Sequence, residues 1–383
     1  MASDEPTSLE TTRSIAPLFQ RFPWGGKQLR NRIVMAPMTR SHSPGKVPGA
    51  DVAVYYRRRA EGGTALLITE GTNPDHPAAS GYPDVPGFYG REGLAGWKRV
   101  VDNVHEAGAL IIPQLWHCGS IRTKGMEPDP TVPAYAPSAI HHPAHQDNGD
   151  VELPHAMTHS DIADTIASFV RSAVSARTLG FDGVELHGAH SYLIDQFFWD
   201  VTNQRTDRYG GSFENRLTFA VELISAVRTA VGEHFPIVFR FSQWKQGDYD
   251  CKLAKNPDQL GRFLHPLAEA GVDVFHASTH RFDEPEFKGS NLNLAGWAKE
   301  LTGRPSITVG SVGLDLDFLR SYGGEHTQTT SLDPLIRRLE RSEFDLVAVG
   351  RALLSDPAWA HKLQAGHEAE ITPFNPSHLS RFE

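Results

Sequence analysis

Apolar and polar positions along the chain form one recurring unit. An amphipathic stretch of helical length ends at a glycine, a short apolar run follows, and polar or small residues come next. Gly108, Gly180 and Gly271 each stand between such a stretch and such a run. Glycine is favoured there because it adopts the left-handed conformation that ends many helices. The recurrence predicts strands that alternate with helices, and therefore an α/β fold.

Eight short apolar runs have the length of buried strands. They cover residues 32–35, 65–69, 110–115, 183–187, 237–241, 274–277, 306–309 and 346–349. Helical patterns lie between them: Leu217, Ala220 and Ile224 share one face, and Ser160 is the expected N-cap of an earlier helix. Eight strands that alternate with helices predict a (β/α)8 TIM barrel, formed as a single domain by residues 1–383.

An open, doubly wound sheet would show the same alternation. Its first strand should lead into a GxGxxG turn, whereas here Met35-Ala36-Pro37-Met38-Thr39 follows that strand, so the barrel is favoured. One long stretch, residues 121–159, shows neither the periodicity of a helix nor that of a strand and is rich in proline and histidine. We interpret it as a loop insertion after strand 3 of the barrel.

Charge and cysteine content exclude several classes of protein. The 383 residues carry 37 Lys and Arg against 46 Asp and Glu, a net charge of −9, which disfavours nucleic acid as a partner. No apolar run approaches the ~18 residues of a membrane span, and the acidic start does not resemble a signal peptide. Cys118 and Cys251 stand alone, which argues against a structural metal site or disulfides. We expect a cytoplasmic protein without membrane or nucleic-acid partners.

Chemistry in such barrels lies at the carboxyl ends of the strands. Gly310-Ser311 and Gly350-Arg351 follow the last two strands. Glycine allows a phosphate to approach the backbone and arginine binds it with two hydrogen bonds, so the pair predicts a site for a phosphorylated ligand. Each motif alone would be read as a turn glycine beside a solvated residue. Their coincidence at the two expected strand ends favours the phosphate site.

Four longer motifs are also present, and the first three of them fall at strand ends. They are Met35-Ala36-Pro37-Met38-Thr39, Gln114-Leu115-Trp116-His117, His187-Gly188-Ala189-His190-Ser191-Tyr192-Leu193 and the segment 203–216, which reads NQRTDRYGGSFENR. In these motifs most specifically, the chain from about residue 17 to 360 resembles the Old Yellow Enzyme family of FMN-dependent ene-reductases. Family membership implies a bound FMN, NAD(P)H as hydride donor and a small electron-poor alkene as substrate.

The resemblance assigns the cofactor contacts residue by residue. The flavin ring is expected against the backbone of Pro37 and Met38 and the hydroxyl of Thr39, where a hydrogen bond tunes its reduction potential. The other implied contacts are Gly71 beside the ring, Gln114 at its pyrimidine edge, Arg240 as a fixed cation, and Gly310, Ser311, Gly350 and Arg351 around the phosphate.

The same resemblance assigns the catalytic residues. His187 and His190 match the pair that donates hydrogen bonds to the carbonyl or nitro oxygen of the substrate, as an oxyanion hole does. Tyr192 matches the proton donor to the α-carbon, and a phenol with an ordinary pKa of about 10 is protonated at neutral pH. The implied reaction is ping-pong reduction of an activated C=C bond. Arg205, Asp207 and Arg216 are expected to hold the loop after strand 4.

Two other functions remain open at this point. Histidines at strand ends could bind zinc in a TIM-barrel hydrolase, and the candidates are His117, His187, His190 and His276. Such barrels usually begin with an HxH motif on strand 1, which this chain lacks, and no metal is expected. A barrel that only carries a flavin is the non-enzymatic alternative. The sequence leaves open whether the chain forms a homo-oligomer.

Overall fold

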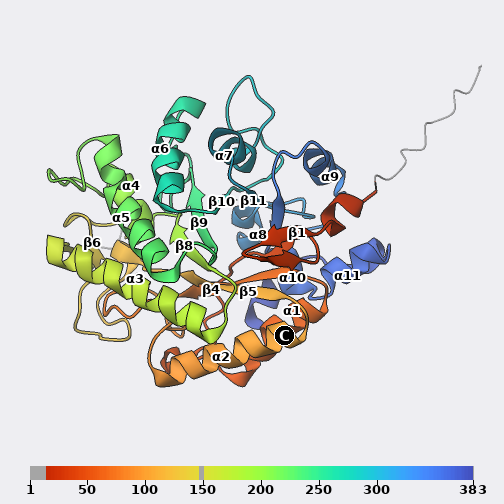
Figure 1. Ribbon diagram of the computed structural model, residues 1–383, viewed down its shortest axis with the longest axis horizontal. Helices are drawn as coiled ribbons and strands as arrows, with labels where there is room; N and C mark the ends of the chain where they lie inside the picture. The colour runs from red at the N-terminus through yellow and green to blue at the C-terminus, as the bar shows by residue number, and fades with distance from the viewer. Residues whose placement is uncertain (1–13, 146–150, 383) are drawn as a thin grey trace, which may run out of the picture.

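Eight parallel strands close into a barrel surrounded by helices (Figure 1). The computed structural model describes residues 14–145 and 151–382. The strands are β3 (Ile33–Met35), β4 (Leu66–Thr72), β5 (Leu110–Leu115), β8 (Val184–Gly188), β9 (Ile237–Ser242), β10 (Val274–Ser278), β11 (Ser306–Val309) and β12 (Leu346–Val349). β12 pairs with β3 and completes the ring. The TIM barrel and all eight predicted strands are confirmed, and the open sheet is excluded.

Helices cover the outside of the barrel. They are α1 (Ala50–Glu61), α2 (Arg91–Glu106), α3 (His159–Leu179), α4 (Leu193–Phe198), α5 (Phe213–Val231), α6 (Pro257–Ala270), α7 (Leu294–Thr302), α8 (Phe318–Tyr322), α9 (Asp333–Glu340), α10 (Arg351–Ser355) and α11 (Trp359–Gln364). The N-cap of α3 is Thr158, so the prediction of Ser160 is wrong. The Thr158 hydroxyl accepts from the Asp161 backbone N–H while the Asp161 carboxylate accepts from that of Thr158, a reciprocal pair that Ser160 cannot form.

The amino-terminal end of the barrel is closed by a short hairpin, β1 (Phe22–Trp24) and β2 (Lys27–Leu29). Its Phe22, Trp24 and Leu29 pack with apolar side chains of the barrel strands such as Val34 and Val238. Three-residue strands give too little periodicity for prediction. Because this end is closed by apolar packing, a ligand must enter from the carboxyl ends of the strands.

Arg122 holds much of the described part of the insertion after β5, residues 121–145 and 151–159. The insertion contains β6 (Tyr135–Ala136), which pairs with β7 (His155–Ala156), as well as two short 3-10 turns. The buried Arg122 guanidinium donates to five backbone carbonyls, those of Ser80, Met126, Glu127, Asp129 and Val132. The predicted loop insertion is therefore present, with one small pair of strands added.

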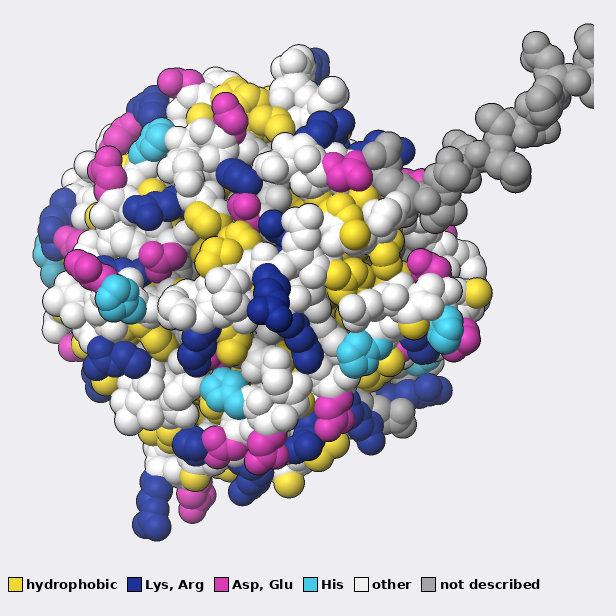
Figure 2. All heavy atoms as spheres, turned by 45° about the vertical axis from the view of Figure 1, so that its right-hand side comes forward, with side chains coloured by type: hydrophobic (Ala, Val, Ile, Leu, Met, Phe, Trp, Pro, Cys, Tyr) yellow, Lys and Arg dark blue, Asp and Glu magenta, His cyan; other side chains and the backbone are white. Residues whose placement is uncertain are grey.

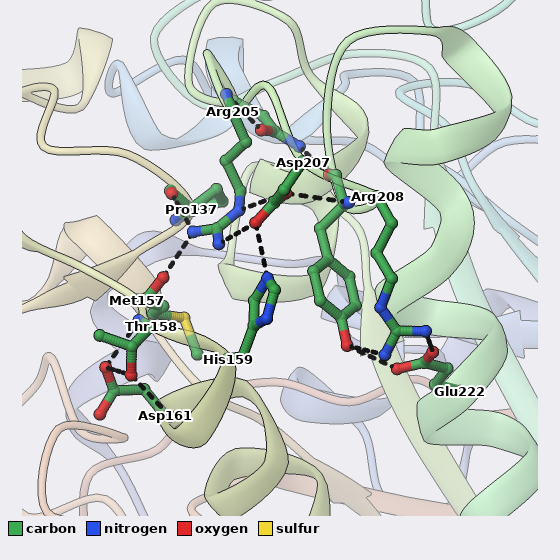
Figure 3. Close-up of polar contacts among 11 residues, drawn as sticks. Pro137, Met157, Thr158, His159, Asp161, Arg205, Asp207, Arg208 and Glu222 are labelled. Carbon is green, nitrogen blue, oxygen red and sulfur yellow. Dashed lines mark hydrogen bonds and ion pairs between the residues drawn. The ribbon is translucent and has the colours of Figure 1, made fainter.

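A second arginine joins the insertion to the loop after β8 (Figure 3). Arg205 donates to the Pro137 and Met157 carbonyls and forms an ion pair of 2.6 Å with Asp207. The same carboxylate lies 2.9 Å from His159 Nε2, at the start of α3. Arg216 donates to the Phe198 carbonyl nearby. The structural role predicted for these loop residues agrees with their contacts.

Candidate active site

A cavity of about 350 Å³ opens at the carboxyl ends of the strands. This size is within the range of small-molecule and cofactor sites. It is lined by nine of the residues predicted from the sequence: Pro37, Met38, Thr39, His190, Arg240, Gly310, Ser311, Gly350 and Arg351. Gly71, Gln114, His187 and Tyr192 do not line it. The structure therefore brings most of the predicted cofactor residues, from four different strands, around one space.

Arg351 is a buried cation without an anionic partner in the described part of the chain. Its guanidinium donates to Ser311 Oγ at 3.0 Å, to the Leu316 carbonyl at 2.6 Å, and to the Asp317 carbonyl and Ser321 Oγ. All of these acceptors are neutral, and only 9% of the residue is exposed. A buried charge is costly unless an opposite charge compensates it. The arrangement fits the phosphate of FMN.

Arg240 is a second buried cation on the same cavity. It donates to Ser278 Oγ at 3.3 Å, and its Nε has no hydrogen-bond partner among residues 14–145 and 151–382. Burial lowers the pKa of Arg240, and the nearby Glu185 carboxylate opposes that effect. A cation held here stabilises a ligand that gains negative charge, as a flavin does when it is reduced.

Two of the predicted glycines are required by close packing. Gly310 has a φ of +141°, and a Cβ there would lie 2.7 Å from the Thr279 carbonyl oxygen. At Gly71 a Cβ would lie 2.2 Å from the Trp116 ring. The structure thus explains Gly71 by the indole that covers it, and contact of Gly71 with a flavin stays a prediction.

The three predicted catalytic side chains lie together at the carboxyl end of β8. The ring centroids of His187 and His190 are 5.1 Å apart, and those of His187 and Tyr192 are 5.0 Å apart. Trp116 meets the Tyr192 ring edge-on at 4.9 Å. His190 and Ser191 have φ values of 61° and 58°, which non-glycine residues seldom adopt. Of the three side chains, His190 also lines the cavity.

Both imidazoles are neutral at physiological pH. Burial lowers the pKa of His187 and of His190 well below the usual value, and the charge of Arg240 adds to the effect. His187 Nδ1 accepts from the Ala189 backbone N–H at 3.3 Å, so the ring proton of His187 lies on Nε2 and can be donated. His190 Nε2 lies 2.8 Å from Ser278 Oγ, which links His190 to Arg240.

Tyr192 is held in its protonated form. Burial raises its pKa well above the ordinary value, and the neighbouring Tyr82 adds to the rise. The two hydroxyl oxygens are 3.0 Å apart. Tyr82 is half-buried in the loop after β4, and its ring stacks on Trp116. Sequence reasoning missed Tyr82 because no motif marks that loop and 110 positions separate the partners.

The segment after β9 fixes the loop that carries these side chains. Ser242 Oγ accepts from the His190 backbone N–H at 3.0 Å, and the Asp195 carboxylate accepts from that of Ser191 at 2.6 Å. Lys245 forms an ion pair with Asp195, and neither side chain is exposed to solvent. Trp244 stacks on the His190 ring with centroids 4.3 Å apart. The contacts of Ser242 with His190 and of Lys245 with Asp195 join residues 50 or more positions apart, so no local pattern in the sequence predicts them.

The metal-hydrolase alternative is not supported. Across the described ranges no group of three His, Cys, Asp or Glu side chains could hold a metal ion. Two of its candidate ligands have other partners: His117 Nε2 lies 3.1 Å from His76 Nδ1, and His276 Nδ1 lies 2.6 Å from a Glu185 carboxylate oxygen.

Comparison with known proteins identifies the family. The model of the NADH:flavin oxidoreductase / NADH oxidase family matches residues 17–370. The chain belongs to this family, the Old Yellow Enzyme family. A putative 12-oxophytodienoate reductase 2 from Oryza sativa subsp. japonica is 37% identical over 348 residues, which cover 89% of this chain and 85% of the relative.

Solved structures of the family share the fold. Morphinone reductase in complex with tetrahydroNAD aligns with a TM-score of 0.76 and 28% identity, over 94% of this chain and 93% of that one. Old Yellow Enzyme from Pichia sp. AKU4542 aligns with a TM-score of 0.79 and 27% identity, over 95% of this chain and 90% of that one. This family member is therefore an NAD(P)H:flavin oxidoreductase with bound FMN and NAD(P)H as the hydride donor.

The distribution of charged side chains on the surface is consistent with an enzyme that acts on small molecules. On the face drawn in Figure 2, Lys and Arg side chains are interspersed with Asp and Glu. Such mixing does not favour a nucleic-acid backbone. Within the described residues, no helix has the length and apolar character needed to cross a membrane.

Proposed function

We propose that this oxidoreductase reduces the C=C bond of α,β-unsaturated carbonyl or nitro compounds by a ping-pong reaction. The observation that carries the proposal is the convergence of two neutral imidazoles and a protonated phenol beside the cavity. A bound FMN would supply the hydride chemistry, with NAD(P)H as the hydride donor and the β-carbon of the alkene as the acceptor. The residues of the chain then have to stabilise the developing charge and supply one proton.

His187 and His190 are assigned to the substrate oxygen. Hydride arrival at the β-carbon pushes negative charge onto the carbonyl or nitro oxygen, and hydrogen bonds aimed at that oxygen strengthen as the charge develops. Neutral imidazoles suit this role because they donate without carrying a competing charge. His187 Nε2 carries the proton for one such bond, since its Nδ1 accepts from Ala189.

Tyr192 is assigned to the α-carbon. Its raised pKa keeps the phenol protonated until the substrate demands a proton. General acid catalysis of this kind contributes roughly 10²–10⁴-fold in rate. The Tyr82 hydroxyl, 3.0 Å away, is placed to return a proton to Tyr192 after turnover.

The cofactor residues follow from the lining of the cavity. Arg351 and Ser311, with the backbone at Gly310 and Gly350, are assigned to the FMN phosphate, and Arg240 to the ring. The backbone of Pro37 and Met38 and the hydroxyl of Thr39, at the end of β3, are assigned to the flavin ring. Gly71 is assigned a place beside the ring, and Gln114 is assigned to its pyrimidine edge. A single-domain chain in the cytoplasm remains our prediction, and homo-oligomer formation remains open.

Anaerobic half-reactions test this proposal. NADPH should bleach the flavin absorbance, and 2-cyclohexenone should restore it. Tyr192→Phe should leave bleaching nearly unchanged and slow the recovery by 10²-fold or more. Tyr89→Phe, outside the cavity lining, is the matched control and should change neither step. Equal slowing of both half-reactions in Tyr192→Phe would defeat the assigned role, and bleaching without recovery in the parent would favour a flavin carrier.

A further inference from the structure

The barrel interior changes character from bottom to top. Its lower level holds apolar side chains, among them Val34, Leu66 and Val238, as is usual for a TIM barrel. The level nearer the cavity instead holds ionisable and polar side chains that are at most 8% exposed, namely Gln114, Glu185, Arg240 and His276. Charged groups are costly in such a place, so this layer calls for an explanation.

Strand register arranges these four side chains as two pairs inside the barrel. Gln114 of β5 pairs with Glu185 of β8, and Arg240 of β9 pairs with His276 of β10. Paired residues of neighbouring parallel strands point to the same face of the sheet. Of the four, Arg240 also lines the cavity, so the layer forms part of the floor beneath the ligand.

The Glu185 carboxylate is the centre of the layer. One oxygen accepts from Gln114 Nε2 at 2.7 Å, and the other lies 2.6 Å from His276 Nδ1. An ionised carboxylate only accepts hydrogen bonds, so the amide nitrogen of Gln114 and the Nδ1 proton of His276 must both face it. The Gln114 side chain therefore has one orientation, with its carbonyl oxygen turned away from Glu185.

Glu185 also acts on the charge of Arg240. Burial lowers the pKa of the Arg240 guanidinium, and the attraction of the Glu185 carboxylate raises it. Negative charge beside a group that is reduced makes reduction harder, whereas the positive charge of Arg240 makes it easier. The two charges therefore have opposite effects on a ligand that is reduced in the cavity.

We propose that Glu185, braced by His276, is a positioning residue of the FMN site, which fixes the Gln114 amide and partly offsets the charge of Arg240. The pair thereby controls both the affinity for FMN and its reduction potential. The inference rests on the proposed contacts of Gln114 and Arg240 with the flavin. It does not depend on which alkene is reduced.

Two substitutions separate orientation from charge, with FMN binding and the midpoint potential as readouts. Glu185→Gln removes the charge and lets the Gln114 amide turn over. It should weaken FMN binding about tenfold and shift the potential positive by about 30 mV, the equivalent of a tenfold preference for the two-electron-reduced form. Glu185→Asp keeps the charge but is one methylene too short to reach both partners. It should weaken FMN binding while the potential stays near that of the parent.

Val238→Ala is the matched control, because Val238 is buried in the apolar layer and pairs with Glu185 in register. It should lower the stability of the barrel and leave FMN affinity and potential unchanged. An unshifted potential in Glu185→Gln, parental FMN affinity in Glu185→Asp, or equal shifts in Val238→Ala would each overturn the inference. If Glu185→Gln does not fold, the affinity of Glu185→Asp decides. If the parent protein does not reduce an enone, the proposed function is refuted, but the FMN affinities and potentials still test the role of Glu185.

Discussion

Removing the ammonium of Lys245 should destabilise the loop that carries the catalytic side chains. Lys245 and Asp195 form an ion pair in which neither side chain is exposed, and Asp195 also accepts from the Ser191 backbone N–H. Lys245→Met leaves the Asp195 carboxylate buried without its partner. Breaking a buried pair in this way costs about 3–5 kcal/mol, a large share of the 5–15 kcal/mol by which native proteins are stable.

Denaturant unfolding of the FMN-loaded protein measures that cost. Burial raises the pKa of Asp195, and Lys245 opposes the rise, so the carboxylate in Lys245→Met should take up a proton on folding. Lys245→Met/Asp195→Asn removes both charges and keeps an acceptor for Ser191, so it should recover most of the lost stability. Lys98→Met breaks the exposed Lys98–Asp102 pair and should cost at most about 0.5 kcal/mol. A loss below 1 kcal/mol in Lys245→Met, or no recovery in the double variant, would show that the ion pair does not stabilise the loop.

Three further predictions follow from single residues. Burial raises the pKa of Glu70 to about 7. The native state therefore keeps the Glu70 proton up to about pH 7, whereas the unfolded chain loses it near pH 4.5. The free energy of unfolding should fall by about 3 kcal/mol as the pH rises from about 4.5 to 7. Glu70→Gln should flatten this pH dependence, measured by urea unfolding, and an unchanged dependence would contradict the prediction. Arg351→Gln should weaken FMN binding about 10–100-fold by fluorescence titration and leave riboflavin binding unchanged, because riboflavin lacks the phosphate; equal losses for both ligands would count against the phosphate site. Tyr82→Phe should slow flavin reoxidation by an enone but not flavin reduction by NADPH, and stopped-flow rates that are unchanged would remove Tyr82 from the proton path.

Local patterns were enough to predict the barrel. The runs at residues 110–115, 306–309 and 346–349 coincide with β5, β11 and β12. A parallel strand buried on both faces is a continuous apolar run, which the sequence displays directly. The hairpin of β1 and β2 was missed because each strand has only three residues.

Prediction of the site succeeded where residues stand at strand ends and failed where contacts cross the fold. His187 and Arg351 lie at the ends of β8 and β12, so the strand pattern placed them. The ion pair of Lys245 with Asp195 joins residues 50 positions apart, and the contact of Glu185 with His276 joins residues 91 positions apart. Neither pair shows any local pattern, because only barrel closure brings the partners together.

A crystal structure of the FMN-loaded protein soaked with a phenolic ligand would test the assigned roles of these residues together. We expect that the phosphate binds Arg351, that the flavin ring covers the floor formed by Arg240, and that the phenolic oxygen accepts hydrogen bonds from His187 and His190. A phosphate bound elsewhere, or a phenolic oxygen that contacts neither imidazole, would contradict these roles.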